Sequence, residues 1–111
     1  MVEYKNTLDA VFHSLADPTR RDMLRRLKPG QQTVGQLAGQ YRLTFAAVSK
    51  HVQVLEKAKL VRKRKQGREQ QVELSPSGLK QADTYLEQYR QMWEGRLERL
   101  ETFLQTKSKQ R

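Results

Sequence analysis

The chain has 111 residues, with 22 Lys and Arg against 12 Asp and Glu, which gives a formal net charge of +10. This length favours a single domain, and the excess of positive charge indicates an anionic partner, with nucleic acid the first candidate and an anionic membrane surface the second. The sequence has no cysteine, which excludes disulfide bonds, thiolate metal sites and a cysteine nucleophile.

Two helices are predicted at the start of the chain. Apolar side chains at helical spacing predict the first helix over residues 5–16, with one apolar face formed by Leu8, Val11, Phe12 and Leu15. Asp17 suits an N-cap and Pro18 the first helical position, so a second helix begins there and runs to about Lys28. Its basic residues are predicted to form a solvated face, with phosphate contact as the alternative; they are Arg20, Arg21, Arg25, Arg26 and Lys28.

A helix-turn-helix arrangement is predicted in the middle of the chain. Thr33 followed three residues later by Gln36 fits a capping box, which predicts a short helix over residues 34–40. After a short turn, Thr44 caps a further helix that ends near Lys57. Two short helices joined in this way, with a polar face exposed on the second, are typical of a DNA-binding helix-turn-helix.

The second of these helices has two chemically distinct faces. Its apolar face is predicted to pack on the core and consists of Val48, Val52, Leu55 and Ala58. The opposite face has small, polar and basic groups and no acid, so it can approach the edges of base pairs. This candidate DNA-binding face consists of Thr44, Phe45, Ala46, Ser49, Lys50, Gln53 and Lys57. An ordinary amphipathic surface helix is the alternative interpretation.

A basic β-hairpin is predicted directly after this helix. An extended segment begins at Leu60, bends at Gly67 and returns with alternating apolar residues to Leu74. Residues 57–68 hold seven basic side chains and no acid, a pattern that favours phosphate contact over a purely solvated run. The predicted phosphate contacts are Lys57, Arg62, Arg64 and Arg68, with Arg68 at the tip placed to enter a minor groove.

The last predicted helix runs from about Leu79 to Leu104 and has an apolar stripe along nearly its whole length. A helix this long projects from a small domain, and a long exposed apolar stripe usually marks an interface. We therefore predict a homodimer in which the last helices pack on each other or on the partner's first helix. The predicted interface consists of Leu8, Val11, Phe12, Leu86, Tyr89, Trp93, Leu97 and Leu100. The predicted organisation is a DNA-binding core over residues 5–75, a dimerisation helix over 76–104 and a frayed tail over 105–111.

Three segments of the chain, residues 11–21, 47–55 and 60–68, are similar to motifs of a known family. They resemble, in this order, the opening motif, the recognition helix and the wing of the ArsR-type winged-helix repressors. The resemblance covers about residues 8–76 and implies a mainly α fold with a small β-hairpin, in which four helices, two strands and a closing helix follow one another. It also implies a dimeric transcriptional repressor that binds a palindromic operator, often in its own promoter, with the first and last helices at the dimer interface.

The resemblance also bears on metal binding. Many members of the family sense a metal through a Cys-x-Cys motif at the start of the third helix, where this chain has Thr33, Val34 and Gly35. Other members use Asp and His on the closing helix, which has no histidine here, and carboxylates alone would make a poor transition-metal site. We expect His13 to be structural and His51 to pack or to contact phosphate. We therefore expect neither metal sensing nor any other cofactor.

These observations predict a DNA-binding transcriptional repressor. Two copies of the recognition helix, about 34 Å apart, would enter successive major grooves of double-stranded operator DNA. The predicted base contacts are Ser49, Lys50 and Gln53, with Thr44, Phe45 and Ala46 at the groove entrance. Phe45, where many relatives have a polar residue, can pack on a thymine methyl group.

Two other functional classes remain open, a dimeric protein-interaction module and a nonspecific nucleic-acid binder on the same scaffold. An enzyme is disfavoured because the sequence combines no nucleophile with a base and has no Gly-rich phosphate loop. The chain lacks a signal-peptide pattern and an apolar run of about 20 residues, so we expect a cytoplasmic protein without a membrane segment. The sequence names neither the operator nor a small-molecule effector.

Overall fold

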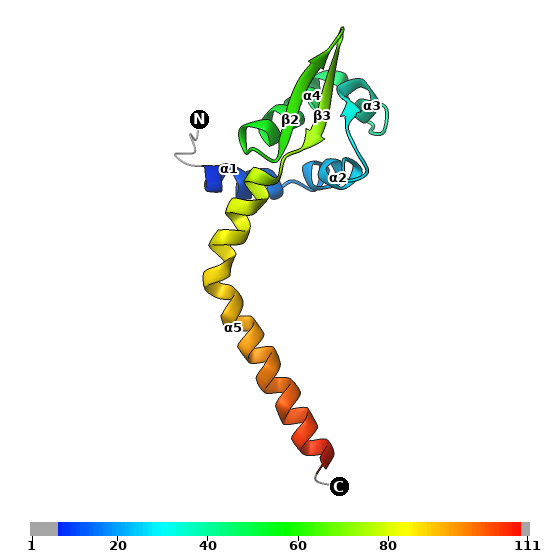
Figure 1. Cartoon of the computed structure of the whole chain (residues 1–111). Helices are drawn as coiled ribbons and strands as arrows, with labels where there is room; N and C mark the ends of the chain where they lie inside the picture. The colour runs from blue at the N-terminus through cyan, green and yellow to red at the C-terminus, as the bar shows by residue number, and fades with distance from the viewer. Residues whose placement is uncertain (1–6, 110–111) are drawn as a thin grey trace.

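The computed structural model describes residues 7–109, and it describes side chains for residues 7–107. Its elements are α1 (Thr7–Leu15), α2 (Pro18–Arg26), β1 (Gln32–Thr33), α3 (Val34–Ala38), α4 (Phe45–Lys57), β2 (Val61–Gln66), β3 (Glu69–Leu74) and α5 (Pro76–Lys109). The predicted mainly α, winged helix-turn-helix fold is confirmed, with β2 and β3 as the wing (Figure 1). The first two residues predicted for α1, and the last two of the chain, lie outside the described residues.

Side-chain caps set the starts of the short helices. The Asp17 carboxylate accepts the backbone N–H groups of Thr19 and Arg20 at 2.8 and 3.1 Å, which caps α2. Thr33 and Gln36 form the predicted capping box of α3, since each side chain accepts the backbone N–H of the other, at 2.9 and 2.8 Å. Both helix starts therefore follow from residues within one turn.

The sheet has three antiparallel strands in the order β1-β3-β2, one more than the sequence predicts. The additional strand β1 consists only of Gln32 and Thr33, which pair with Val72 and Gln71 of β3. Two residues are too few to show the alternation by which a strand is recognised. This strand ties the wing to the beginning of α3.

The last helix extends beyond the predicted range of about Leu79 to Leu104, although it starts where the predicted dimerisation region over 76–104 starts. It begins at Pro76, because proline is preorganised for the first helical turn, and it continues to Lys109. The predicted tail is therefore helical over residues 105–109, a stretch that has neither Gly nor Pro to end a helix.

One hydrophobic core lies between the sheet and helices α1 to α4. The predicted buried face of α4 is confirmed, since its four apolar side chains are at most 1% exposed. Among the buried apolar residues described, α5 contributes only Ala82. The core consists of Val11, Met23, Leu27, Val34, Leu37, Val48, Val52, Leu55, Ala58, Leu60, Val61, Val72 and Ala82.

The prediction of a solvated basic face on α2 is wrong for Arg20. This residue is buried, because its guanidinium group donates to the backbone carbonyls of Ser14 and His13 at the end of α1. Arg21 and Arg25 of the same helix are exposed, in agreement with the prediction.

The helix α5 projects far from the rest of the fold. A compact chain of this length would have a radius of gyration of about 13 Å, whereas the value here is 19.5 Å. The 34 residues of α5 extend for about 50 Å, away from the wing, as Figure 1 shows. At its near end α5 packs on α1, where the rings of Phe12 and Tyr85 meet edge to face with centroids 5.6 Å apart. The far part of α5 leaves its apolar side chains exposed.

Candidate nucleic-acid interface

The exposed face of α4 holds together the side chains predicted to read DNA. Thr44 caps the helix by accepting the Ala47 N–H at 3.0 Å. Six of the seven predicted residues are exposed, including Phe45 at 60%, and Ser49 is half-buried. The seven are Thr44, Phe45, Ala46, Ser49, Lys50, Gln53 and Lys57. These seven side chains are therefore accessible and none of them is acidic, while Glu56 of the same helix lies 3.5 Å from the Lys63 ammonium of the wing.

The turn between α3 and α4 is fixed to α2 by a polar cluster. The Tyr41 hydroxyl donates to Asp22 at 2.6 Å, and Arg25 and Arg26 also donate to that carboxylate. The Tyr41 hydroxyl, followed by the two guanidinium groups, holds the pKa of Asp22 well below its usual range. Burial and the hydrogen bond to Asp22 raise the pKa of Tyr41 to about 12. The cluster thus fixes the turn that leads into the recognition helix.

The far end of α4 is closed by a Schellman motif. The N–H of Lys59 donates to the Glu56 carbonyl, and the N–H of Leu60 donates to the Leu55 carbonyl, both at 3.0 Å. This motif needs a residue in the left-handed conformation, and Lys59 adopts that conformation with a φ of 58°. The chain turns here from the recognition helix directly into the wing.

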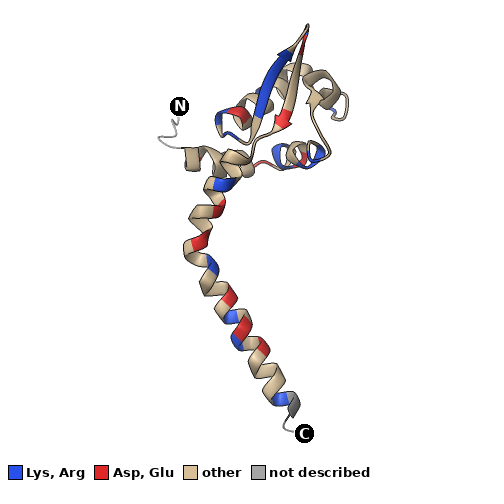
Figure 2. Cartoon of the chain, in the orientation of Figure 1, with Lys and Arg blue, Asp and Glu red and all other residues tan. Residues whose placement is uncertain are grey.

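The two faces of the wing differ in chemistry. Arg62 and Arg64 are on the outer face, where both donate to Glu73 of the neighbouring strand, at 2.6 and 3.3 Å for their closest atoms. The hydrogen bond from Arg62 holds the pKa of Glu73 below its usual value. Lys63 is on the inner face and lies 3.5 Å from Glu56 of α4. Figure 2 shows the basic residues gathered along β2, whereas basic and acidic residues mix along α5.

The inner face of the wing and the start of α4 enclose a hollow of about 380 Å³. Lys63 and Arg68 of the wing and Ser49 of α4 contribute its cationic and hydroxyl groups. Val34 and Phe45 are among its apolar walls. The hollow therefore combines cationic, hydrogen-bonding and apolar groups, together with one carboxylate, that of Glu69.

Sequence reasoning missed two lysines on this inner face. Lys63 lines the hollow, and Lys65 follows on the same side of β2, opposite Gln70, which also lines it. The alternation that begins at the buried Val61 could have separated them from the outer arginines, because alternate residues of a strand face opposite sides.

The predicted dimer-interface residues differ in exposure. Val11 is fully buried in the core of its own chain, so its prediction as an interface residue is wrong. Leu8 is half-buried, and the other residues are exposed by 37 to 62%. The exposed ones are Phe12, Leu86, Tyr89, Trp93, Leu97 and Leu100. Helix α5 also exposes Leu79, Tyr85, Met92, Phe103 and Leu104. This set forms an apolar surface along most of α5.

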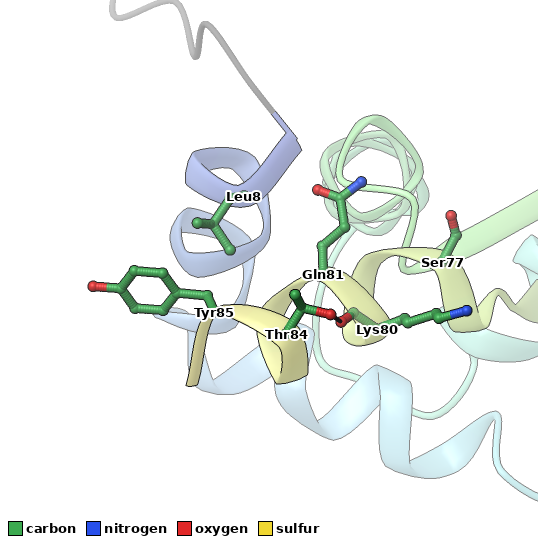
Figure 3. A pocket seen from close by; sticks show the side chains of 6 residues that line it. All are labelled: Leu8, Ser77, Lys80, Gln81, Thr84 and Tyr85. Atoms are coloured by element: carbon green, nitrogen blue, oxygen red, sulfur yellow. Dashed lines mark hydrogen bonds between the residues drawn. The ribbon is translucent and has the colours of Figure 1, made fainter. Parts of the chain in front are cut away.

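A second hollow, of about 730 Å³, lies between α1 and α5 (Figure 3). Its walls are formed by Leu8 of α1 and by Ser77, Lys80, Gln81, Thr84 and Tyr85 of α5. It adjoins the apolar surface of α5 through Tyr85 and lies apart from the recognition helix.

Comparison with known proteins supports the interpretation of this fold. Residues 15–64 match a family described as "Helix-turn-helix domain". The chain is 38% identical over 81 residues to the HTH-type transcriptional regulator Rv2034 of Mycobacterium tuberculosis. The aligned region covers 73% of this chain and 76% of that protein. It is 32% identical over 60 residues to the transcriptional repressor SdpR of Bacillus subtilis, covering 54% of this chain and 67% of SdpR.

Solved structures agree. The crystal structure of the ArsR family transcriptional regulator RHA00566 matches with a TM-score of 0.74 and 32% identity, covering 80% of this chain and 98% of that one. The chain belongs to the ArsR-type winged-helix transcriptional regulators. A further ArsR-like regulator, from Rhodococcus sp. RHA1, has a TM-score of 0.71 and 28% identity over 90% of this chain and 92% of that one.

Membership of the ArsR-type regulators makes this chain a DNA-binding transcriptional regulator and not an enzyme. Within residues 7–109, no three His, Asp or Glu side chains are grouped so as to hold a metal ion. In that same part of the chain, no helix is long and apolar enough to cross a bilayer.

Proposed function

We propose that this ArsR-type regulator is a homodimeric repressor that binds a palindromic operator, with α4 of each copy in a major groove. The observation that carries the proposal is the exposed face of α4, whose seven predicted contact residues include no acid and which is flanked by a basic wing. Its width suits the major groove, which admits an α-helix. Repression is favoured by similarity to a relative that is named a transcriptional repressor.

The proposed contacts divide into base reading and phosphate binding. Ser49, Lys50 and Gln53 contact base edges, since their side chains can donate or accept hydrogen bonds there. Thr44, Phe45 and Ala46 lie at the entrance of the groove, and Phe45 packs on a thymine methyl group.

Phosphate contacts come from the end of α4 and from the wing. Lys57, Lys63 and Arg68 are the principal contacts of each copy, and Lys65 adds to them. Arg62 and Arg64 are exposed, but they approach a phosphate only in competition with Glu73, and Lys63 does so in competition with the longer contact to Glu56. Two copies with three principal contacts each predict that log affinity falls by about 5 per tenfold rise in salt, at about 0.9 for each neutralised phosphate.

The dimer is proposed to form through α5, together with Phe12 and Leu8 of α1. The exposed apolar surface of α5 supports this, because a contiguous apolar surface of this extent is unusual on a monomer. In such a dimer the hollow between α1 and α5 lies beside the contact with the partner. Regulation without a metal is proposed because the chain has no cysteine and its closing helix has no histidine.

The decisive experiment is selection of bound DNA from a random pool. The expected product contains two inverted half-sites whose centres are about 10 base pairs apart, the spacing of successive major grooves. Enrichment of no sequence would identify a nonspecific binder, and enrichment of single half-sites would contradict the proposed dimer.

The base-reading face is tested with a matched pair of lysine variants. Lys50→Ala is expected to reduce the ratio of operator affinity to random-DNA affinity by about tenfold, the scale of one good base contact. Lys80→Ala removes the same charge from an exposed position on α5 and should leave this ratio unchanged. Equal effects of the two variants would refute the assignment of the reading face.

The interface is tested by sedimentation of Trp93→Glu. Trp93 is 43% exposed in the middle of the apolar surface of α5, so a carboxylate there should convert the dimer to monomers. Gln91→Glu adds the same charge about 160° around the helix and should remain dimeric. A wild-type protein that sediments as a monomer at micromolar concentration would overturn the proposed dimer.

A further inference from the structure

A single buried arginine joins three helices behind the recognition face. Arg20 belongs to α2, and its side chain is only 11% exposed. Its Nε donates to the Ser14 carbonyl at 2.9 Å and its Nη2 to the His13 carbonyl at 3.2 Å, both at the end of α1. Its Nη1 lies 3.2 Å from Nδ1 of His51 in α4, and 3.9 Å from the carboxylate of Asp17.

The chemistry of this contact assigns a role to each partner. A guanidinium group has only donors, so in this contact Nδ1 of His51 is the acceptor. At about 100° per residue, His51 lies roughly 160° around α4 from Gln53, on the side turned away from the reading face. His51 therefore holds α4 from behind, and its predicted alternative role as a phosphate contact is not the one the geometry supports.

A second polar link runs between the same two helices. The Ser14 hydroxyl donates to the Val54 carbonyl of α4 at 3.4 Å. Within the described residues, no buried side-chain nitrogen or oxygen atom lacks a hydrogen-bond partner. The end of α1 is thus connected to α4 at His51, through Arg20, and at Val54, which lie about one helical turn apart. Helix α1 also packs on α5 through Phe12.

We infer that Arg20 is a positioning residue for DNA reading, which sets the rotation of α4 against α1 through His51. A guanidinium group holds its donors in a rigid plane, so three acceptors from two helices determine the geometry together. Loss of the contact would let α4 rotate and would misdirect Ser49, Lys50 and Gln53. The inference rests on the proposed operator binding, and it adds a residue that touches no DNA to the determinants of specificity.

The test compares two variants of His51 by fluorescence anisotropy with operator DNA and with random DNA of the same length. His51→Leu removes the acceptor, and we expect the operator-to-random affinity ratio to fall about tenfold, the scale of one hydrogen bond to a charged group. His51→Gln keeps an acceptor oxygen and should stay within about threefold of wild type. A purely structural role would lower the melting temperature of both variants and leave the ratio unchanged.

Arginine variants supply the matched control. Arg20→Met should lower the ratio at least as much as His51→Leu, because it also removes the bonds to the Ser14 and His13 carbonyls, and the double variant should be no worse than Arg20→Met, because the two substitutions share the Arg20–His51 contact. Arg21→Met removes the next arginine of α2, which donates to the Leu15 carbonyl of α1 at 2.7 Å and is exposed, and it should leave the ratio unchanged. Should Arg20→Met fail to fold, the two His51 variants decide.

The outcomes separate this inference from the proposed function. A wild-type protein without operator preference would refute the proposed function. A wild-type protein with operator preference, combined with a His51→Leu ratio equal to that of wild type, would overturn the positioning role alone. Additive losses in the double variant would also overturn it, because they would mean that the two side chains act independently.

Discussion

The crossing of α5 over the turn between α4 and β2 requires a residue without a Cβ atom. Gly78 lies in the first turn of α5, and its N–H donates to the Lys59 carbonyl at 2.8 Å. A Cβ added to Gly78 would lie 2.4 Å from the Ala58 carbonyl oxygen and 2.8 Å from that of Lys59. Both neighbours are backbone atoms, so the overlap cannot be relieved by rotating a side chain. Gly78→Ala must therefore displace α5 from the turn that joins the recognition helix to the wing.

The expected cost can be worked from these contacts. Overpacking of this kind costs about 1–3 kcal/mol, and weakening the hydrogen bond of Gly78 costs about 1 kcal/mol more. The higher helix propensity of alanine returns about 1 kcal/mol. We therefore expect Gly78→Ala to reduce the free energy of unfolding by about 2 kcal/mol, measured by urea denaturation at a fixed protein concentration.

Gly95 of the same helix provides the control. A Cβ added there meets no atom within 4 Å, so Gly95→Ala should gain the propensity of alanine, about 1 kcal/mol, without a clash. The two substitutions are chemically identical and are expected to shift the urea midpoint in opposite directions. If both variants were stabilised, the close approach of α5 to the Ala58 carbonyl would be refuted.

Three further predictions concern the wing and the turns around the recognition helix. Lys59→Gly should raise the free energy of unfolding by about 1 kcal/mol, because Lys59 has a φ of 58° that glycine adopts without steric cost; an unchanged urea midpoint would contradict the left-handed assignment. Tyr41→Phe should cost about 2 kcal/mol at neutral pH, since it removes the 2.6 Å hydrogen bond to the Asp22 carboxylate. The pKa of Tyr41 is raised from 10.0 to about 12 in the folded state. The difference in free energy of unfolding between wild type and Tyr41→Phe should therefore be complete below pH 10 and should disappear as the pH rises through about 12. A difference that does not vary with pH would argue against the contact. In salt titrations of DNA affinity, Arg68→Ala should reduce the slope by about 0.9, whereas Arg62→Ala should change it less because Arg62 is already paired with Glu73; equal reductions would refute the different roles of these two wing arginines.

Much of the fold could be predicted because its signals are local. The capping box of Thr33 and Gln36 and the cap at Thr44 each depend on residues within one helical turn, and both form as predicted. The buried and exposed faces of α4 follow from the spacing of its apolar residues, so the candidate reading face was also accessible from the sequence.

The missed features depend on partners that are distant in the sequence. The strand β1 exists only because β3, about 40 residues later along the chain, offers it hydrogen bonds. Strand alternation places the wing lysines and the wing arginines on opposite sides of β2, but the contact between Lys63 and Glu56 shows which of the two sides faces α4. Val11 was predicted at a partner interface because periodicity marks a residue as apolar without stating which surface covers it.

By itself, the sequence determined the order of helices and hairpin, the polarity of each helical face and the basic character of the chain, because each depends on neighbouring residues. The tertiary structure alone decided which charged side chains are buried and which are exposed. Arg20 and Arg21 are adjacent and identical in chemistry, yet one is buried against His51 and the other is exposed. Which of them is buried depends on the three-dimensional packing of α1, α2 and α4, because a charged side chain can be buried only where acceptors from separate helices converge on it.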